Sequence, residues 1–254
     1  MDFQEILAHH LLDHRIVKLA RIGGTTLAVT QHLVMMWIVG AALIVFLSFA
    51  ARSETGAGKR LRTAVEAILI YIRDSILEPI FHERTEAYLP YFLTLFFFIF
   101  CCNLAGLVPY AATATGNISV TGGLALCTFM LMQFAGIKEQ GLTSYLKHIA
   151  PSGIPWPVLI ILYPIEILGM FVRCIALTIR LFANMIAGHI VALSFLYLIF
   201  IFGAMSKPVG FMVALPAVAL ALFISLLDVL VGLLQAYIFT ILTALFVGAS
   251  VHPH

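Results

Sequence analysis

Ionisable side chains stand inside a long apolar segment near the end of this chain, where charge is expensive. Residues 158–205 are hydrophobic almost throughout, and Arg180 lies near the middle of this segment. An arginine at a membrane midplane costs roughly 2.5–3.5 kcal/mol on insertion scales. It also keeps its proton, because its pKa lies above about 12. The pattern predicts a fixed positive charge with a function at Arg180; a structural charge satisfied inside a helix bundle is the alternative.

Polar residues of the last apolar run are expected to lie near Arg180 and His189. If the two long apolar runs at the end of the chain fold back at Lys207, Asp228 lies within one helical turn of His189. The same counting places Gln235 next to Arg180. Histidine is the side chain best suited to exchange protons near neutral pH. We therefore expect a proton path at His189 and Asp228, with a buried pair that only fixes packing as the alternative.

Helical phase separates these groups further. Arg173 and Arg180 are seven residues apart and share a helix face, whereas His189 lies about half a turn round from Arg180. The side chains of Arg180 and His189 are thus expected to point in different directions. Arg173 either serves the same function or snorkels to the interface, and Glu166 is either interfacial or part of the path. Small or polar residues that admit a neighbouring helix lie on or beside the arginine face: Ala176, Ala183, Asn184 and Ala187.

Composition identifies the class of protein. The 254 residues are 62% hydrophobic and 10% charged, against about 25% charged in soluble domains. The chain is therefore expected to be a polytopic membrane protein. It has no basic tail or patch for nucleic acid. Four cysteines in apolar runs, none in a C-x-x-C motif, are read as small buried apolar residues: Cys101, Cys102, Cys127 and Cys174.

The terminal segments carry histidines whose role the sequence leaves open. His10 and His14 have the spacing of a metal pair on a helix, but an exposed terminal segment is the simpler interpretation, and we expect no metal and no cofactor. The same applies to His9, and to His252 and His254 at the other end. The first residues contain no long apolar core of a signal peptide, so the first apolar run is expected to be an uncleaved span.

Hydrophobic runs predict an all-α fold in one membrane domain, 1–254. About five membrane helices and one amphipathic surface helix are expected, the last two helices being long, tilted and folded as a hairpin. Neither of the last two runs contains a polar turn that would divide it. The predicted segments are an N-terminal segment 1–32, span 33–51, amphipathic helix 59–82, spans 88–108 and 118–137, and long helices 158–205 and 208–251.

Orientation follows from the distribution of Lys and Arg. Five spans place 52–86, 138–157 and the C-terminus on one side, which carries most of the Lys and Arg outside the apolar runs. Positive charge is enriched on the cytoplasmic side of membrane proteins. The C-terminus is therefore expected in the cytoplasm and the N-terminus outside.

Specific motifs resemble subunit a of F-type ATP synthases. They are Arg180-Leu-Phe-Ala-Asn-Met-Ile-Ala-Gly-His189, Asp228 followed by Gln235-Ala-Tyr-Ile-Phe, Asn103-Leu-Ala-Gly-Leu-Val-Pro-Tyr110, and Gly116-Asn-Ile-Ser-Val-Thr121. The final pair of long helices resembles this family too. The resemblance runs from about residue 85 to the C-terminus; before that, only the layout matches.

The resemblance implies a role for each polar group. Arg180 matches the family's essential arginine, Gln235 a glutamine beside it, and Asn184 a polar residue on the ring-facing side. His189 and Asp228 match two proton-path positions, in the order found in mitochondrial members and reversed from some bacterial ones. Ala183 stands where some members have glycine. Two further positions match an acidic and a basic site near the path: Glu166 and Arg173.

The family's mechanism would make the chain a non-catalytic stator subunit. It would offer two half-channels to a rotating ring of c subunits, with Arg180 as the barrier against proton leak, and it would sit with the subunit b stalk and the rest of the synthase. A bacterial inner membrane is favoured over a mitochondrial one. The alternatives are a self-contained transporter or ion channel, which would work as the purified chain alone, and an intramembrane enzyme, for which the motifs H-E-x-x-H and G-x-S-x-G are missing.

Overall fold

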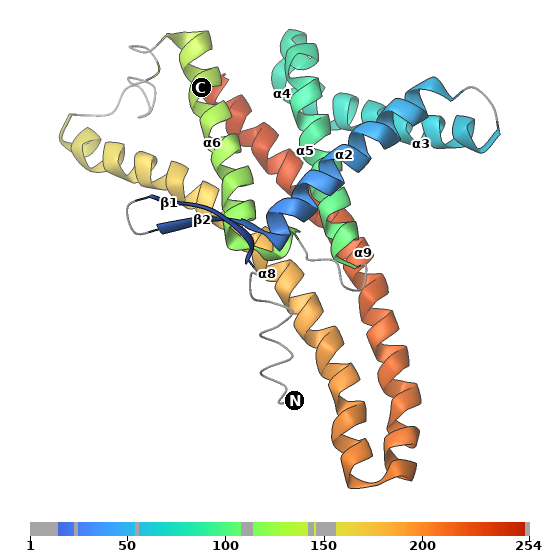
Figure 1. Ribbon diagram of the computed structural model, residues 1–254. Helices are drawn as coiled ribbons and strands as arrows, with labels where there is room; N and C mark the ends of the chain where they lie inside the picture. The colour runs from blue at the N-terminus through green and yellow to red at the C-terminus, as the bar shows by residue number, and fades with distance from the viewer. Residues whose placement is uncertain are drawn as a thin grey trace. The chain divides into compact units, whose positions relative to one another are not determined.

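Helices account for nearly all of the structure. The computed structural model describes residues 15–22, 25–53, 56–107, 114–141, 145 and 156–251. The order of elements along the chain is visible in Figure 1. They are β1 Arg15–Ile22, β2 Thr25–Thr30, α2 Gln31–Arg52, α3 Gly56–Ile72, η1 Arg73–Leu77, α4 Glu78–Phe81, η2 His82–Arg84, α5 Thr85–Gly106, η3 Ala114–Gly116, α6 Ile118–Gln140, α8 Trp156–Met205 and α9 Lys207–Val251.

Five helical segments are long and apolar enough to cross a membrane, which confirms the predicted polytopic helical fold. They are Gln31–Arg52, Gly56–Gly106, Ile118–Gln140, Ile160–Met205 and Lys207–Val251. Helices suit this setting because every backbone N–H and C=O group is satisfied within the segment. The last two are uninterrupted: Pro164 lies inside α8 and Pro216 inside α9 without ending either helix. The predicted tilt of these two helices stays a prediction.

A short β-hairpin precedes the first span, and the sequence analysis did not predict it. β1 and β2 pair antiparallel, with Arg15 opposite Thr30 and Ile22 opposite Thr25. Gly23 and Gly24 separate the two strands in the sequence, and a two-glycine connection is typical of tight hairpins. The pattern is therefore present in the sequence, although the prediction describes this part only as an exposed, polar terminal segment.

Contacts divide the chain into two compact units, each described here by itself. The first unit comprises the described residues of 1–42, 98–120 and 180–235. Its apolar core joins Val39 of α2, Cys102 of α5 and Ala114 of η3, each less than a tenth exposed. The core thus fixes the end of α5 against the start of the first span. Partly buried neighbours complete it: Met35, Met36, Phe98, Cys101 and Ala105.

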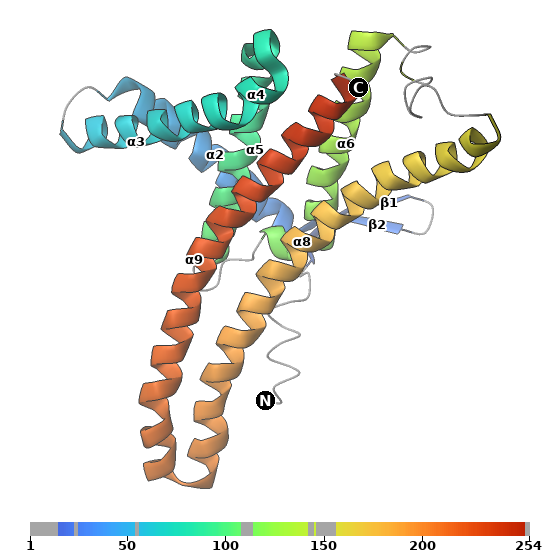
Figure 2. The ribbon, with the colours of Figure 1, turned by 180° about the vertical axis from the view of Figure 1, so that it is seen from behind.

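The second unit comprises the described residues of 43–97, 121–179 and 236–254. Hydrogen bonds hold the end of α9 along α6. Ser250 Oγ donates to the Met132 carbonyl oxygen at 2.9 Å, and Gln140 Nε2 donates to the Ser250 carbonyl oxygen at 2.7 Å. Figure 2 shows these two helices side by side near the C-terminus. Such bonds matter because lipid offers no partner for polar side chains.

The predicted amphipathic helix is confirmed over α3, η1 and α4. Its apolar stripe points inward: Ile72 and Ile76 are buried, while Arg73 and Asp74 are exposed. A π-helical stretch lies in the middle, at η1. This segment covers the end of α9, because a Cβ on Gly248 would strike the side chain of Ile80. The chain then leaves the helix at His82, whose φ is 49°.

The prediction that the cysteines are buried is wrong in part, and several other predictions concern residues outside the described part of the chain. Cys102 is buried as expected, but Cys127 is exposed on α6, and Cys101 and Cys174 are only partly buried. The expectation was wrong for Cys127 because a residue in a membrane helix has a face toward lipid, where a small apolar side chain is equally stable. The predicted features at 1–14, 108–113, 146–155 and 252–254 lie outside the described residues, the terminal histidines among them.

The two longest helices meet closely at their turn. α8 ends at Met205 and α9 begins at Lys207, as counting from Lys207 assumed. Within the first unit they run side by side (Figures 1 and 2). A Cβ on Gly210 would lie 2.5 Å from the Cα atom of Gly203. Real Cβ atoms do not approach backbone so closely, so glycine at 210 permits this contact.

We predict that Gly210→Ala destabilises the hairpin by about 1–3 kcal/mol, as over-packing does elsewhere. The measurement is the amount of assembled chain in membranes and the midpoint temperature of the solubilised complex. Gly203→Ala is the matched control, because a Cβ at position 203 meets nothing within 4 Å. Equal stability of the two variants would show that this close approach is unimportant.

Candidate functional site

Arg180 is the first residue of the stretch 180–235 of the first unit, and it is exposed on α8. Its neighbours along the same face, Ala183 and Ala187, are exposed as well, while Asn184 is partly buried. The described part of the chain gives Arg180 no carboxylate within 4 Å. A permanent charge in an apolar helix therefore points outward over small side chains, toward whatever covers this face.

His189 turns the other way, as its helical phase predicts. The imidazole is partly buried, and both ring nitrogens lie beside backbone carbonyl oxygens. Nδ1 is 3.1 Å from the Met185 oxygen, one turn earlier in α8, and Nε2 is 3.0 Å from the Gly106 oxygen. A neutral ring can donate to only one of these acceptors, whereas an imidazolium donates to both. The site thus accepts the protonated ring with both contacts made.

The Gly106 carbonyl is available because of its place in α5. Gly106 is the last residue of this helix, and the final carbonyls of a helix have no intrahelical partner. The carboxyl end of a helix also carries partial negative charge, which favours a cation nearby. The end of α5 therefore presents an acceptor to His189 that a mid-helix carbonyl would not offer as freely.

Asp228 lies beside His189, which confirms the pairing predicted by counting along the hairpin. Its carboxylate interacts electrostatically with the His189 ring. The room for that carboxylate comes from Gly188: a Cβ there would lie 2.6 Å from Asp228 Oδ2 and 2.7 Å from its Cγ. Glycine at 188 was quoted in the sequence motif but was given no role. Its position next to the histidine was the available signal.

Asn103 is a further polar contact that the sequence analysis did not assign. Its side chain is 3% exposed. Nδ2 donates to the Gly232 carbonyl oxygen of α9 at 3.1 Å, and Oδ1 accepts from Thr115 Oγ1 at 2.8 Å. One buried amide therefore joins α5, η3 and α9. An asparagine inside an otherwise apolar span was the signal that pointed to it.

Gln235 is buried on α9, at 5% exposure. In the described residues its Nε2 has no hydrogen-bond partner. A buried amide donor costs free energy unless an acceptor forms a hydrogen bond with it. Its predicted place next to Arg180 stays a prediction, since no bond between the two is formed in the described part of the chain.

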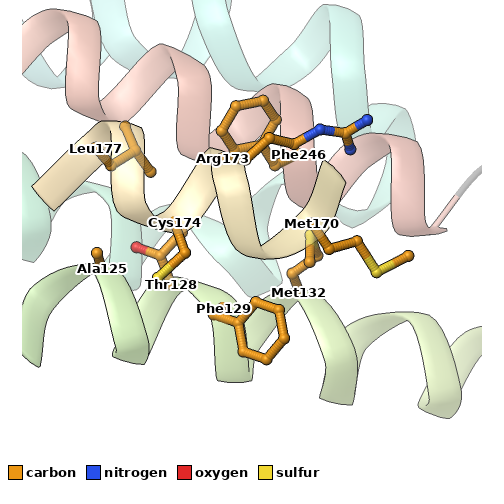
Figure 3. A pocket seen from close by; sticks show the side chains of 9 residues that line it. All are labelled: Ala125, Thr128, Phe129, Met132, Met170, Arg173, Cys174, Leu177 and Phe246. Atoms are coloured by element: carbon orange, nitrogen blue, oxygen red, sulfur yellow. The ribbon is translucent and has the colours of Figure 1, made fainter. Parts of the chain in front are cut away.

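Arg173 and Glu166 belong to the second unit. Arg173 lies with its guanidinium carbon 5.4 Å from the centroid of the Phe246 ring, a cation–π distance. It borders a small pocket lined by residues of α6, α8 and α9. Figure 3 shows Phe129 and Met132 of α6 on the opposite side of that pocket. Glu166 is partly buried and has no ion pair within the described residues.

The structure thus brings together part of the predicted set. His189 and Asp228 are neighbours, and Arg180 lies on the same helix as His189 but on its exposed face. Arg173 is instead held by aromatic and apolar packing. In the described residues, no group of three or more His, Cys, Asp or Glu side chains could hold a metal ion.

Comparison with known proteins identifies the family. The family model for the ATP synthase A chain matches residues 33–248. ATP synthase subunit a 2 of Chlorobaculum tepidum is 42% identical over 97% of this chain and 72% of its own length. ATP synthase subunit a of Chloroherpeton thalassium is 42% identical over 96% of this chain and 75% of its own length.

A third relative agrees with these two. ATP synthase subunit a of Myxococcus xanthus is 43% identical over 91% of this chain and 77% of its own length. The family model and the relatives cover the spans, the hairpin of α8 and α9, and the His189–Asp228 pair described above. This chain is a multi-pass membrane protein and belongs to the ATP synthase A chain family.

Proposed function

We propose that this chain is the proton-translocating stator subunit of an F-type ATP synthase and that it is not itself catalytic. The observation that carries the proposal is the exposed Arg180 in an apolar helix of a chain from this family. A charge that cannot be neutralised needs an acidic partner when it lies within the hydrocarbon region of the membrane. The described part of the chain gives it no acid within 4 Å, and in this proposal another subunit supplies the partner.

That partner is a carboxylate on a rotating ring of c subunits. The small side chains of Ala183 and Ala187, which lie beside Arg180, let another helix approach closely. Opposite charge nearby favours the ionised form of a carboxyl group, so a ring carboxylate passing Arg180 gives up its proton. Arg180 cannot relay that proton, since a guanidinium keeps its own protons in proteins. It therefore separates the two half-channels.

His189 and Asp228 carry the proton between water and the ring. The imidazolium has two carbonyl acceptors and a neighbouring carboxylate, while the neutral ring keeps one of these bonds. The ring can therefore take and release a proton with little rearrangement, which suits a relay at neutral pH. The family resemblance further gives Glu166 an acidic position on the proton path and Arg173 a basic position.

Two amides complete the roles. Asn184, partly buried one turn after Arg180, is a polar contact on the ring-facing side. Gln235 has an unmatched donor, which the oxygen of a water in the half-channel would satisfy. Both groups would guide the ring carboxylate past the barrier without binding it tightly.

Rotation couples many proton crossings to one synthesis event. Each charge that crosses a membrane at 100 mV releases about 2.3 kcal/mol. A neutralised ring carboxylate can turn into lipid and travel almost a full circle before it meets the second half-channel. The chain works with the subunit b stalk and the remaining synthase subunits. It resides in a bacterial inner membrane with its C-terminus in the cytoplasm.

Arg180→Ala should abolish ATP-driven acidification of inverted membrane vesicles and raise passive proton leak after the ATPase head is removed. The fixed charge that keeps the half-channels apart is gone in this variant. Lys207→Ala is the control, because it removes an exposed charge at the hairpin turn and should leave both measurements unchanged. Normal pumping by Arg180→Ala would contradict the assignment and favour a self-contained transporter.

His189→Ala should lower the rate of proton flux roughly 100-fold without a rise in passive leak, because one group of the relay is lost while the barrier stays. The assay is ATP-driven acidification together with leak in stripped vesicles. Ser194→Ala on the same helix is the matched control, since its hydroxyl donates to the Ile190 carbonyl oxygen one turn away. Unchanged flux in His189→Ala would return the histidine to a structural role.

Gly188→Ala should reduce proton flux about threefold to tenfold by pushing the Asp228 carboxylate away from His189. The added Cβ would come within 2.6 Å of Asp228 Oδ2. Gly169→Ala on α8 is the control, as nothing lies within 4 Å of a Cβ there. Flux is measured per assembled complex. Equal rates for the two glycine variants would mean that the Asp228 position is not critical.

A further inference from the structure

We infer that Asn103 is a positioning residue for proton transfer, which holds α9 in register so that Asp228 meets His189. The inference rests on the proposed function of this pair. Asn103 touches neither side chain; it acts through the backbone of Gly232. Thr115 orients the Asn103 amide through a hydrogen bond and so shares this positioning role. Every contact in the argument lies within the first unit.

The orientation of the Asn103 amide follows from its two partners. The Gly232 carbonyl can only accept a hydrogen bond, so the amide NH₂ group must face it. The amide oxygen then faces Thr115, whose hydroxyl can donate. Thr115 is fully buried, at 0% exposure. Each of the two bonds thus enforces the other, and water does not compete for either.

The anchored carbonyl lies between the functional residues of α9. Gly232 comes four residues after Asp228 and three before Gln235. At 1.5 Å of rise per residue, both side chains lie within about one helical turn of the anchor. A shift of α9 along its axis or about it would therefore move Asp228 and Gln235 together. The hydrogen bond from Asn103 to Gly232 opposes such a shift between Asp228 and Gln235.

The same turn of α5 also contacts α8. Asn103 and Gly106 are three residues apart in the last turn of α5, and the Gly106 oxygen lies 3.0 Å from His189 Nε2. One rigid turn therefore binds α9 through Asn103 and α8 through Gly106. Because both bonds start from this turn, it sets the spacing between the histidine and the aspartate.

Close packing at the anchor makes the position specific. A Cβ on Gly232 would lie 3.1 Å from the Asn103 Cβ, which is tighter than an ordinary contact. Glycine at 232 lets the asparagine stem lie against the α9 backbone, so its short side chain reaches the carbonyl. A longer amide would have to bend, and a side chain on residue 232 would hold the two helices apart.

Two substitutions at Thr115 separate positioning from simple packing. Thr115→Ser keeps the hydroxyl but leaves a small void, whereas Thr115→Val keeps the volume and loses the donor. Positioning through the amide predicts that Thr115→Ser pumps close to the wild-type rate, while Thr115→Val and Asn103→Leu slow pumping about threefold to tenfold, the scale of one lost buried hydrogen bond. A packing role predicts the opposite order for the two Thr115 variants.

The test uses the whole synthase in inverted vesicles, with ATP-driven acidification expressed per assembled complex. Asp228→Asn is measured in parallel, and Asn103→Leu is added to it. Since Asn103 acts through Asp228, the second substitution should slow the double variant little further. A rate for Thr115→Val equal to or above that for Thr115→Ser, with Asp228→Asn slow, would overturn the positioning role alone. Normal pumping by Asp228→Asn itself would instead overturn the proposed proton path.

Discussion

The lack of water in a bilayer is the constraint on which this structure depends. A polar group at membrane depth has to find its partner within the protein. His189 does so with two carbonyl oxygens and the Asp228 carboxylate, and Asn103 uses both ends of its amide. Arg180 stands apart because it is exposed and finds no acid within 4 Å among the described residues. Under the proposed function, this exposed charge is the one left for another molecule.

Counting residues predicted the long hairpin well, for a simple geometric reason. Two straight helices joined by a one-residue turn rise by the same amount per residue, so equal distances from the turn lie at equal heights. The break at Ser206 made the count from Lys207 correct, and Asp228 fell beside His189. Helical phase was equally reliable, since it separated the exposed Arg180 from the inward His189.

Contacts from outside the hairpin could not be predicted in this way. The bond from Asn103 to Gly232 joins residues 129 positions apart, and no periodicity relates α5 to α9. Glycine roles were also hidden, because the sequence does not say which glycine faces a carboxylate, as Gly188 does, and which faces open space, as Gly169 does. The sequence reading of Cys127 failed for a related reason: apolar character in a membrane helix does not distinguish lipid from protein interior.

These contacts suggest a division of labour within the proposed function. The proton-carrying pair is surrounded by acceptors from fixed backbone: Met185 within its own helix and Gly106 at the end of α5. Backbone carbonyl groups do not titrate in this range, so the acceptors of His189 stay acceptors whether or not the ring carries the extra proton. Arg180 has no comparable cage among the described residues, and in the proposed function it would meet its partner only as the partner passes. The stator would therefore change protonation at His189 and Asp228, change electrostatic contacts at Arg180, and keep its backbone still at both.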